Sequence, residues 1–305
     1  MKPLSFVIIT YNRPADTLEL LKNISGLNRA GDLLEDVIVL NNASEEDYSD
    51  VRAFISAEKT IPLRFIEAPS NLGVTRGRNH ALDHAKGDIV IFLDDDAVLG
   101  NPDALENVVR SFTTPGFEGR PVAIVSFRVL YYSTGEMQVN ALPHKKFKKF
   151  SREREFFTYY FAGGAHAIRR SLLEQAGRLP EEFFYGMEEY DLSYRIIEAG
   201  YCIKYDSSIE MRHKESTLGR KPRPEKLRMM WVNKGKVAWR YLPKRYFLST
   251  VLLWSFQYLK VTRFSLGGYI SGWKQILSIP RTERRTPLSR RALEYLRKVE
   301  ARLWY

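Results

Sequence analysis

The chain has 305 residues and a formal net charge of +11; 44% of its residues are hydrophobic and 27% are charged. These proportions are ordinary for a packed globular protein, so they exclude a wholly disordered chain, a collagen and a coiled coil. At roughly 150 residues per domain, the length predicts one large domain or two smaller ones.

The single cysteine and the start of the chain bear on its compartment. Cys202 has no partner for an internal disulfide, which favours a reducing compartment. The first residues enter a strand-like apolar run without the cleavage pattern of a signal peptide. The longest uncharged apolar stretch, Tyr246–Leu259, has 14 residues, whereas a spanning helix needs about 20. We therefore expect a cytoplasmic protein without an ordinary transmembrane helix.

The charge is distributed unevenly along the chain. From Arg212 to Tyr305 there are 23 Lys and Arg residues against 5 Asp and Glu, whereas residues 1–211 carry 24 against 31. A basic tail on a mildly acidic body indicates contact with a polyanion, either nucleic acid or an anionic membrane surface. A merely solvated basic surface is the alternative.

The first half of the chain alternates strand-like and helix-like patterns. Continuous apolar runs, typical of strands buried on both faces, occur at residues 4–9, 37–40, 63–66, 89–93 and 122–127. Helices are predicted from Pro14 and over residues 75–86. This order favours a Rossmann-like α/β fold with a mainly parallel sheet flanked by helices. We expect a catalytic domain over residues 1–212 and a basic, aromatic, mainly helical region over residues 213–305.

Three carboxylates, Asp94, Asp95 and Asp96, follow the run at residues 89–93. Ligands of such sheets bind beyond the carboxyl ends of the strands, and adjacent carboxylates that repel one another usually persist because a cation binds them. Alternate residues of an extended chain share a face, so Asp94 and Asp96 are candidate ligands for Mg²⁺ or Mn²⁺. The alternative is a polar turn that caps the next helix.

A second acidic group, formed by Glu188, Glu189 and Asp191, lies in the first turn of a predicted helix that stops at Gly200. These carboxylates either complement the helix dipole or supply a general base that faces a nucleotide and metal site. His213 follows a strand-like stretch and is a candidate metal ligand, with a structural role as the alternative.

Several motifs in order resemble glycosyltransferase family 2, the inverting enzymes with a GT-A fold. A dinucleotide fingerprint and a P-loop lysine are both missing after the first strand, which disfavours a dehydrogenase or a P-loop NTPase. The resemblance spans about residues 3–215. It rests on the segments VIITYNRP (7–14), NLGVTRGRNHAL (71–82), GDIVIFLDDD (87–96), FAGGAHAIRRSLLEQAGRLPEEFF (161–184), MEEYDLSYRIIEAGY (187–201) and IEMRHKES (209–216).

The resemblance implies a role for each matched residue. Asp94, Asp96 and His213 would hold Mn²⁺ or Mg²⁺, and Glu189 would be the base, with Glu188 and Asp191 as rivals. The donor would be a nucleotide-diphosphate sugar. Its binding residues would be Thr10, Tyr11, Asn12, Arg13, Asn41, Asn42, Asn71, Arg78, Asn79, Asp94 and Asp95. The acceptor side would contain Gly163, Gly164 and Ala165.

Two departures from the family pattern affect this reading. Asn41-Asn42 stands where the family often has an Asp that reads the nucleobase, so a UDP-sugar and a dTDP-sugar both remain open. Glu188-Glu189 replaces the usual Glu-Asp pair. The mechanism implied is direct displacement, in which the deprotonated acceptor hydroxyl attacks the anomeric carbon.

The resemblance and the basic tail together predict the partners. We expect a sugar or lipid-linked acceptor in cell-surface polysaccharide or glycolipid assembly, and a tail that holds the protein peripherally on the inner face of the cell membrane. The rival is that the apolar stretches of the tail pack on the catalytic domain or form a homodimer contact. A nucleotidyltransferase and a nucleic-acid-binding protein are the alternative functions. A nucleotidyltransferase would need a basic loop that binds a triphosphate, and the N-terminal segment is a poor one. A nucleic-acid-binding function would leave the acidic groups without a role, so we expect no nucleic-acid partner.

Overall fold

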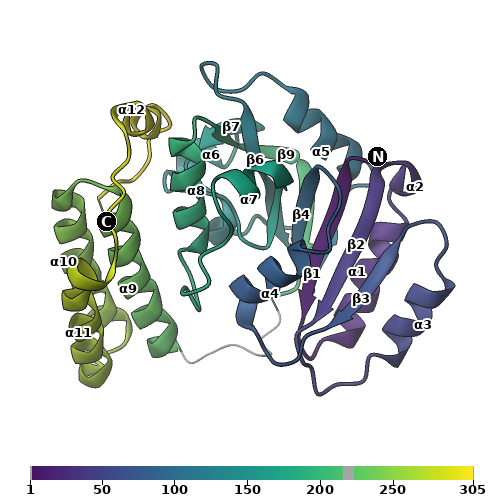
Figure 1. Ribbon diagram of the computed structural model, residues 1–305, viewed down its shortest axis with the longest axis horizontal. Coiled ribbons are helices and arrows are strands. Elements are labelled where there is room, and N and C mark those ends of the chain that lie inside the picture. The colour runs from purple at the N-terminus through teal and green to yellow at the C-terminus, as the bar shows by residue number, and fades with distance from the viewer. Residues whose placement is uncertain (1, 216–222, 305) are drawn as a thin grey trace.

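A mixed β-sheet stands at the centre of the computed structural model, which describes residues 2–215 and 223–304 (Figure 1). Ser216, the last residue of the predicted segment IEMRHKES, lies outside the described residues. The order of the strands is β3-β2-β1-β4-β8-β6-β9-β5, with β7 paired to β9. The strands are β1 (Leu4–Thr10), β2 (Leu34–Asn41), β3 (Leu63–Glu67), β4 (Ile89–Asp94), β5 (Ala97–Leu99), β6 (Val122–Tyr131), β7 (Glu155–Thr158), β8 (Ala165–Arg169) and β9 (Cys202–His213).

Helices flank this sheet, which confirms the α/β architecture (Figure 1). Those of the first part are α1 (Pro14–Ser25), α2 (Ala30–Leu33), α3 (Ser49–Ala57), α4 (Gly73–Leu82), α5 (Ala104–Thr113), the 3₁₀ turn η1 (Val139–Ala141), α6 (Phe147–Phe150), α7 (Arg170–Gln175) and α8 (Glu188–Glu198). Those of the basic region are α9 (Arg223–Tyr241), α10 (Lys244–Val261), α11 (Leu266–Thr282) and α12 (Arg290–Lys298).

The sheet is parallel over β3, β2, β1 and β4, as the alternating pattern predicts, and becomes mixed beyond β4. Ile9 pairs with Asp94 and Thr10 with Asn41, so these strands end at one edge. The antiparallel strand β8 begins beside the same edge, where Ala165 pairs with Leu93. The sheet therefore brings three segments to one edge: those that follow β1 and β4, and the one that precedes β8.

The basic region is largely helical, and α9, α10 and α11 lie side by side at one end of the molecule (Figure 1). Trp231 of α9 is fully buried and stacks on Tyr258 and Tyr269, with ring centroids 5.6 and 5.7 Å away. Helix α12 returns to the sheet, where the Tyr295 hydroxyl donates to the Thr158 carbonyl at 2.7 Å. Among the described helices, none is long and apolar enough to cross a membrane.

Candidate active site

The acidic segment after β4 forms a compact cluster rather than continuing as a strand. The chain turns at Asp95 and Asp96, so it is this turn, not the alternation of an extended strand, that brings Asp94 and Asp96 together. Their carboxylates and the His213 imidazole offer ligand atoms that all lie within 4.8 Å of one another. Asp96 is buried, and its Oδ1 lies 3.1 Å from Nε2 of His213. The structure thus brings together the three residues that the sequence predicts as metal ligands, and this group could hold a metal ion.

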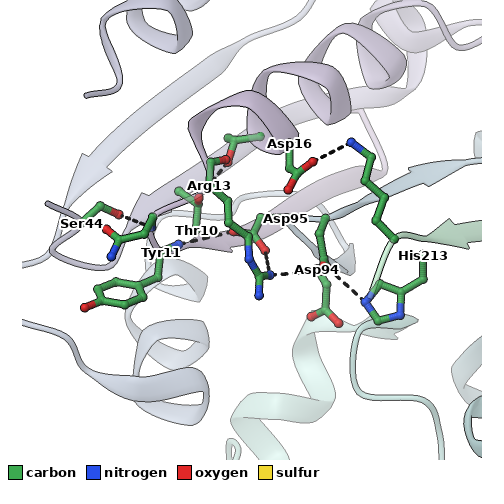
Figure 2. Close-up of polar contacts among 12 residues, drawn as sticks. Thr10, Tyr11, Arg13, Asp16, Ser44, Asp94, Asp95 and His213 are labelled. Carbon is green, nitrogen blue, oxygen red and sulfur yellow. Dashed lines mark hydrogen bonds and ion pairs between the residues drawn. The ribbon is translucent and has the colours of Figure 1, made fainter. Parts of the chain in front are cut away.

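Two arginines contact the carboxylates of this cluster. Arg13, just before α1, donates to Asp95 Oδ1 at 2.7 Å and lies 3.3 Å from Asp96 Oδ2. Figure 2 shows Arg13 reaching the cluster from one side and His213 from the other. Arg78 of α4 donates to Asp94 Oδ1 at 2.9 Å. Burial raises the pKa of Asp95 to about 6 although Arg13 opposes the shift. The guanidinium of Arg13 thus contacts both Asp95 and Asp96.

Two glycines before β8 let the acidic groups approach the backbone. A Cβ atom on Gly164 would collide with the carboxylate of Asp94, and one on Gly163 would collide with Oε1 of Glu189. The same Cβ on Gly163 would lie 3.5 Å from Nη1 of Arg78. A side chain at either position would therefore displace the facing carboxylate, Glu189 at Gly163 and Asp94 at Gly164.

The carboxylates at the start of α8 have different surroundings. Met187, with φ at +79°, turns the chain into the helix and directs Glu188 and Glu189 toward the glycines. No hydrogen bond reaches Oε2 of the buried Glu188 from residues 2–215 or 223–304, the part of the chain that the structure describes. Burial and the neighbouring Glu188 raise the pKa of Glu189 to about 8. Carboxyl groups whose pKa lies near neutrality are suited to accept and release protons.

The third carboxylate of this helix has a different environment. Asp191 is buried and accepts hydrogen bonds from Arg195 at 2.9 Å, Arg240 at 2.8 Å and the Tyr241 hydroxyl at 2.9 Å. It lines neither of the two cavities described next. Because three donors occupy its carboxylate, Asp191 is a weaker candidate for the base than Glu189, and the choice between them stays a prediction.

Two cavities meet at the acidic cluster and share Asp94, Tyr185 and His213 in their walls. The first, of about 530 Å³, lies beyond the ends of β1 and β4; its other walls include Tyr11, Arg13, Asn42, Asn71, Arg78, Asp95, Asp96, Phe184 and Lys226. The second, of about 670 Å³, lies over β8 and α8; its other walls include Tyr160, Gly163, Gly164, Ala165, Glu188, Glu189, Tyr190, Lys234, Trp254 and Arg302. We call them the β1 cavity and the α8 cavity.

The model of the family described as "Glycosyl transferase family 2" matches residues 5–177, which is more than half of the chain. The chain belongs to glycosyl transferase family 2. It is therefore a glycosyltransferase, and the segments with Asp94 and Gly164 both fall inside the matched region.

Two solved glycosyltransferases and one relative illustrate the extent of the likeness. The family 2 chain is 24% identical over 225 residues to the O-antigen chain rhamnosyltransferase WbaN of Salmonella anatum, covering 70% of this chain and 66% of that protein. The mannosyltransferase PcManGT of Pyrobaculum calidifontis, solved with GDP-Man and Mn²⁺, has a TM-score of 0.59 at 20% identity, covering 98% of this chain and 79% of that one. TarS of S. aureus, solved with UDP-GlcNAc, has a TM-score of 0.63 at 16% identity, covering 92% and 81%. These structures confirm the GT-A fold.

The structure of this family 2 glycosyltransferase separates the residues expected around the donor into two groups. Tyr11, Arg13, Asn42, Asn71, Arg78, Asp94 and Asp95 line the β1 cavity. Four others line neither cavity and hold the fold: Thr10 bonds to Tyr48 and Thr17, Asn12 to Ser44 and Glu45, Asn41 to Ser44 and Glu67, and Asn79 to Leu179 and Glu181. The structure thus shows these four side chains connecting loops, and their contact with a donor stays a prediction.

Several wall residues gave no signal in the sequence. Phe184, Tyr185 and Lys226 line the β1 cavity, and Lys234, Trp254 and Arg302 line the α8 cavity. All lie in segments far along the chain from the acidic cluster, and only the folded structure places them beside it. Aromatic and basic residues were visible in the basic region, but the sequence pattern did not indicate which of them face inward.

Proposed function

We propose that the protein transfers a sugar, with inversion, from a nucleotide-diphosphate sugar in the β1 cavity to an acceptor hydroxyl in the α8 cavity. The observation that carries this proposal is the meeting of the two cavities at Asp94 and His213. A donor whose diphosphate faces this cluster presents its anomeric carbon to the α8 cavity. The acceptor then approaches from the side opposite the leaving group, which inverts the configuration.

The cluster of Asp94, Asp96 and His213 fits a divalent cation. Two carboxylates and an imidazole suit Mn²⁺ and are also compatible with Mg²⁺. Gln138 Oε1 lies 3.3 Å from Nδ1 of His213 and so orients the ring with Nε2 toward Asp96. When bound, the cation would neutralise the charge of the diphosphate leaving group.

Glu189 is the base in this proposal. It lines the α8 cavity across Gly163 from Arg78, so a hydroxyl in that cavity has a proton acceptor near the junction. Glu188 keeps the proton affinity of Glu189 high, because two carboxylates in one site resist ionising together. Arg78 and Lys226 in the β1 cavity supply positive charge for the diphosphate.

The basic region is proposed to lie on an anionic membrane. Helices α10 and α11 expose an apolar face formed by Leu248, Leu252, Phe256, Leu266, Ile270 and Leu277. Exposed cations border this face: Arg245, Lys260, Arg263 and Lys274. Such a combination suits the interface of an acidic bilayer. Together with the likeness to an O-antigen rhamnosyltransferase, it supports a role in cell-surface polysaccharide or glycolipid assembly.

Release of the nucleotide tests the proposed reaction. A panel of UDP-, dTDP- and GDP-sugars is incubated with the protein and either Mn²⁺, Mg²⁺ or EDTA, and free nucleoside diphosphate is measured. At least one donor should be hydrolysed slowly when Mn²⁺ or Mg²⁺ is present, and Asp96→Ala should abolish this hydrolysis. Asp32→Ala, which removes an exposed carboxylate from α2, is the matched control. Cleavage that persists in Asp96→Ala or in EDTA would contradict the metal site.

A further inference from the structure

The α8 cavity contains a cluster of positive charge on the side of the basic region. Lys145 precedes α6, Lys234 lies on α9 and Arg302 follows α12, and all three line the cavity that also contains Glu189. We call them the cation triad. Three segments that are distant in sequence therefore bring like charges together, which costs free energy unless an anion offsets the repulsion.

The two lysines of the triad differ from their sequence neighbours in their partners. Lys146 forms an ion pair with Glu300, and Lys236 forms one with Glu283. Among the residues that the structure describes, no carboxylate lies within ion-pair distance of Lys145 or Lys234. Their charge is thus directed into the cavity rather than used to hold the fold.

The surroundings of Lys234 disfavour its charged form. Burial, together with the charges of Lys145 and Arg302, lowers the pKa of Lys234 to about 7. Its ammonium lies 4.9 Å from the ring centroid of Trp254 and 5.4 Å from that of Tyr190. An anion bound beside it would restore the ammonium form.

Aromatic rings connect the triad with the base. Tyr160 stacks on Tyr190 with ring centroids 4.5 Å apart, and both line the cavity together with Glu189. Lys145 lies 5.2 Å from the centroid of Tyr160. Aromatic surfaces suit the apolar face of a sugar ring, so the cavity offers room for a sugar between the base at one end and the cations at the other.

We propose that the cation triad binds a phosphoryl group carried by the acceptor, so that the acceptor is a phosphate- or diphosphate-linked glycan. This inference rests on the proposed function, in which the α8 cavity holds the acceptor. A phosphoryl dianion matches three converging cations better than a carboxylate does. The donor diphosphate is not a competing explanation, because the triad lines only the α8 cavity.

Binding of simple phosphates to the full chain tests the proposal without any donor or transfer. Pyrophosphate, glucose 1-phosphate, glucuronate and farnesyl diphosphate are titrated separately in EDTA by isothermal calorimetry, with melting curves to verify folding. Lys145→Ala and Lys234→Met should each weaken pyrophosphate binding about tenfold or more, the loss of a charge-assisted contact. Lys59→Ala, which removes an exposed lysine that lines neither cavity, should change it less than about twofold, because no charge of the triad is removed.

The outcomes separate the proposal from its rivals. Pyrophosphate binding that is lost in Lys226→Ala and kept in both triad variants places the anion with the donor and overturns the inference. Glucuronate bound as tightly as glucose 1-phosphate overturns the phosphoryl assignment. Tighter binding of farnesyl diphosphate than of glucose 1-phosphate supports a lipid-linked source, and the reverse supports a soluble sugar phosphate. Since nucleotide release is measured separately, failure of one proposal is distinguishable from failure of the other.

Discussion

The acidic residues at the start of α8 show how neighbours in sequence acquire separate tasks. Glu188 and Glu189 line the α8 cavity, where burial raises the pKa of both. Asp191 is one turn further along and is bound by two arginines and a tyrosine. The first two carboxyl groups therefore face the α8 cavity, whereas the third is occupied by hydrogen bonds on the side of the basic region.

Replacing Glu189 by Gln should remove the base while preserving its shape. We expect turnover to fall by about 10²- to 10⁴-fold, as is typical when a general base is lost, with donor binding nearly unchanged. Steady-state kinetics with a competent donor and acceptor would measure this. A normal rate in Glu189→Gln combined with a large loss in Glu188→Gln would transfer the role to Glu188.

The same variant should change the pH dependence of stability. The pKa of Glu189 is raised from the ordinary value of 4.5 to about 8, so the folded protein binds more protons than the unfolded chain between these values. This contribution to the free energy of unfolding is complete below pH 4.5 and is lost as the pH rises through 8. Glu189→Gln should therefore melt at a higher temperature than the parent at pH 8–9 in EDTA. Equal melting temperatures there would show that the burial of Glu189 carries no cost.

Gly164 should tolerate no side chain. In Gly164→Ala the new methyl group meets the Asp94 carboxylate, so the ligand pair must shift and metal-dependent nucleotide release should fall at least about tenfold, a loss of about 1.4 kcal/mol of transition-state stabilisation. Gly267→Ala in α11 is the matched control, because its Cβ would meet nothing within 4 Å. Equal activity of the two variants would contradict the crowding at Gly164.

At the scale of elements, α8 is joined to the basic region by a buried ion-pair network. Arg240 of α9 contacts Asp191 of α8, Glu182 before α8 and Glu283 after α11. Tyr241 adds a hydrogen bond to the same aspartate. The helix that carries the candidate base is thus positioned from behind by the helices of the basic region.

Asp191→Asn should lower the stability of this junction more than it lowers the rate of sugar transfer. It leaves Arg240 and Arg195 short of one buried negative charge, and breaking a buried ion pair typically costs about 3–5 kcal/mol. We expect a clear drop in melting temperature, with activity per folded molecule reduced less than in Glu189→Gln. Thermal denaturation and kinetics at low temperature would separate the two effects. An unchanged melting temperature with a loss of turnover would return Asp191 to the list of candidate bases.

The elements near the site were predictable where the signal is local. Apolar runs predicted β1, β2, β3, β4 and most of β6, and Pro14 marked the start of α1. Strand β7 was not predicted, because Glu155–Thr158 is short and gains its hydrogen bonds from β9. Likewise Lys145, Lys234 and Arg302 meet only through long-range packing, and neither their residue type nor their spacing indicates it.

At the scale of the whole molecule, α10 and α11 carry exposed apolar residues, and the exposed cations lie on these helices and in the loop between them. Their opposite faces pack inward through Phe247, Val251, Tyr258 and Ile276. The rival prediction, that the apolar stretches pack on the rest of the chain, therefore accounts for the buried residues of α10 and α11. It does not account for the exposed apolar residues of the same helices. A division into domains at residue 212 stays a prediction.

A liposome flotation assay measures membrane attachment. The protein should float with acidic liposomes at low salt and dissociate at high salt, since each basic residue near an anionic surface contributes about 1 kcal/mol. Leu252→Glu combined with Phe256→Glu should abolish flotation, because charges would enter the apolar interface. Val139→Glu, also at an exposed apolar position, is the control. Failure of the parent protein to bind acidic liposomes at low salt would contradict the membrane proposal.

The two cavities use very different stretches of the chain. The named walls of the β1 cavity extend from Ile9 to Lys226, whereas those of the α8 cavity reach Arg302. A chain is synthesised from its N-terminus, and its parts begin to fold in that order. The residues that line the β1 cavity therefore leave the ribosome before the α8 cavity is complete. A nascent chain can contain every wall residue of the β1 cavity while it still lacks Arg302 of the α8 cavity.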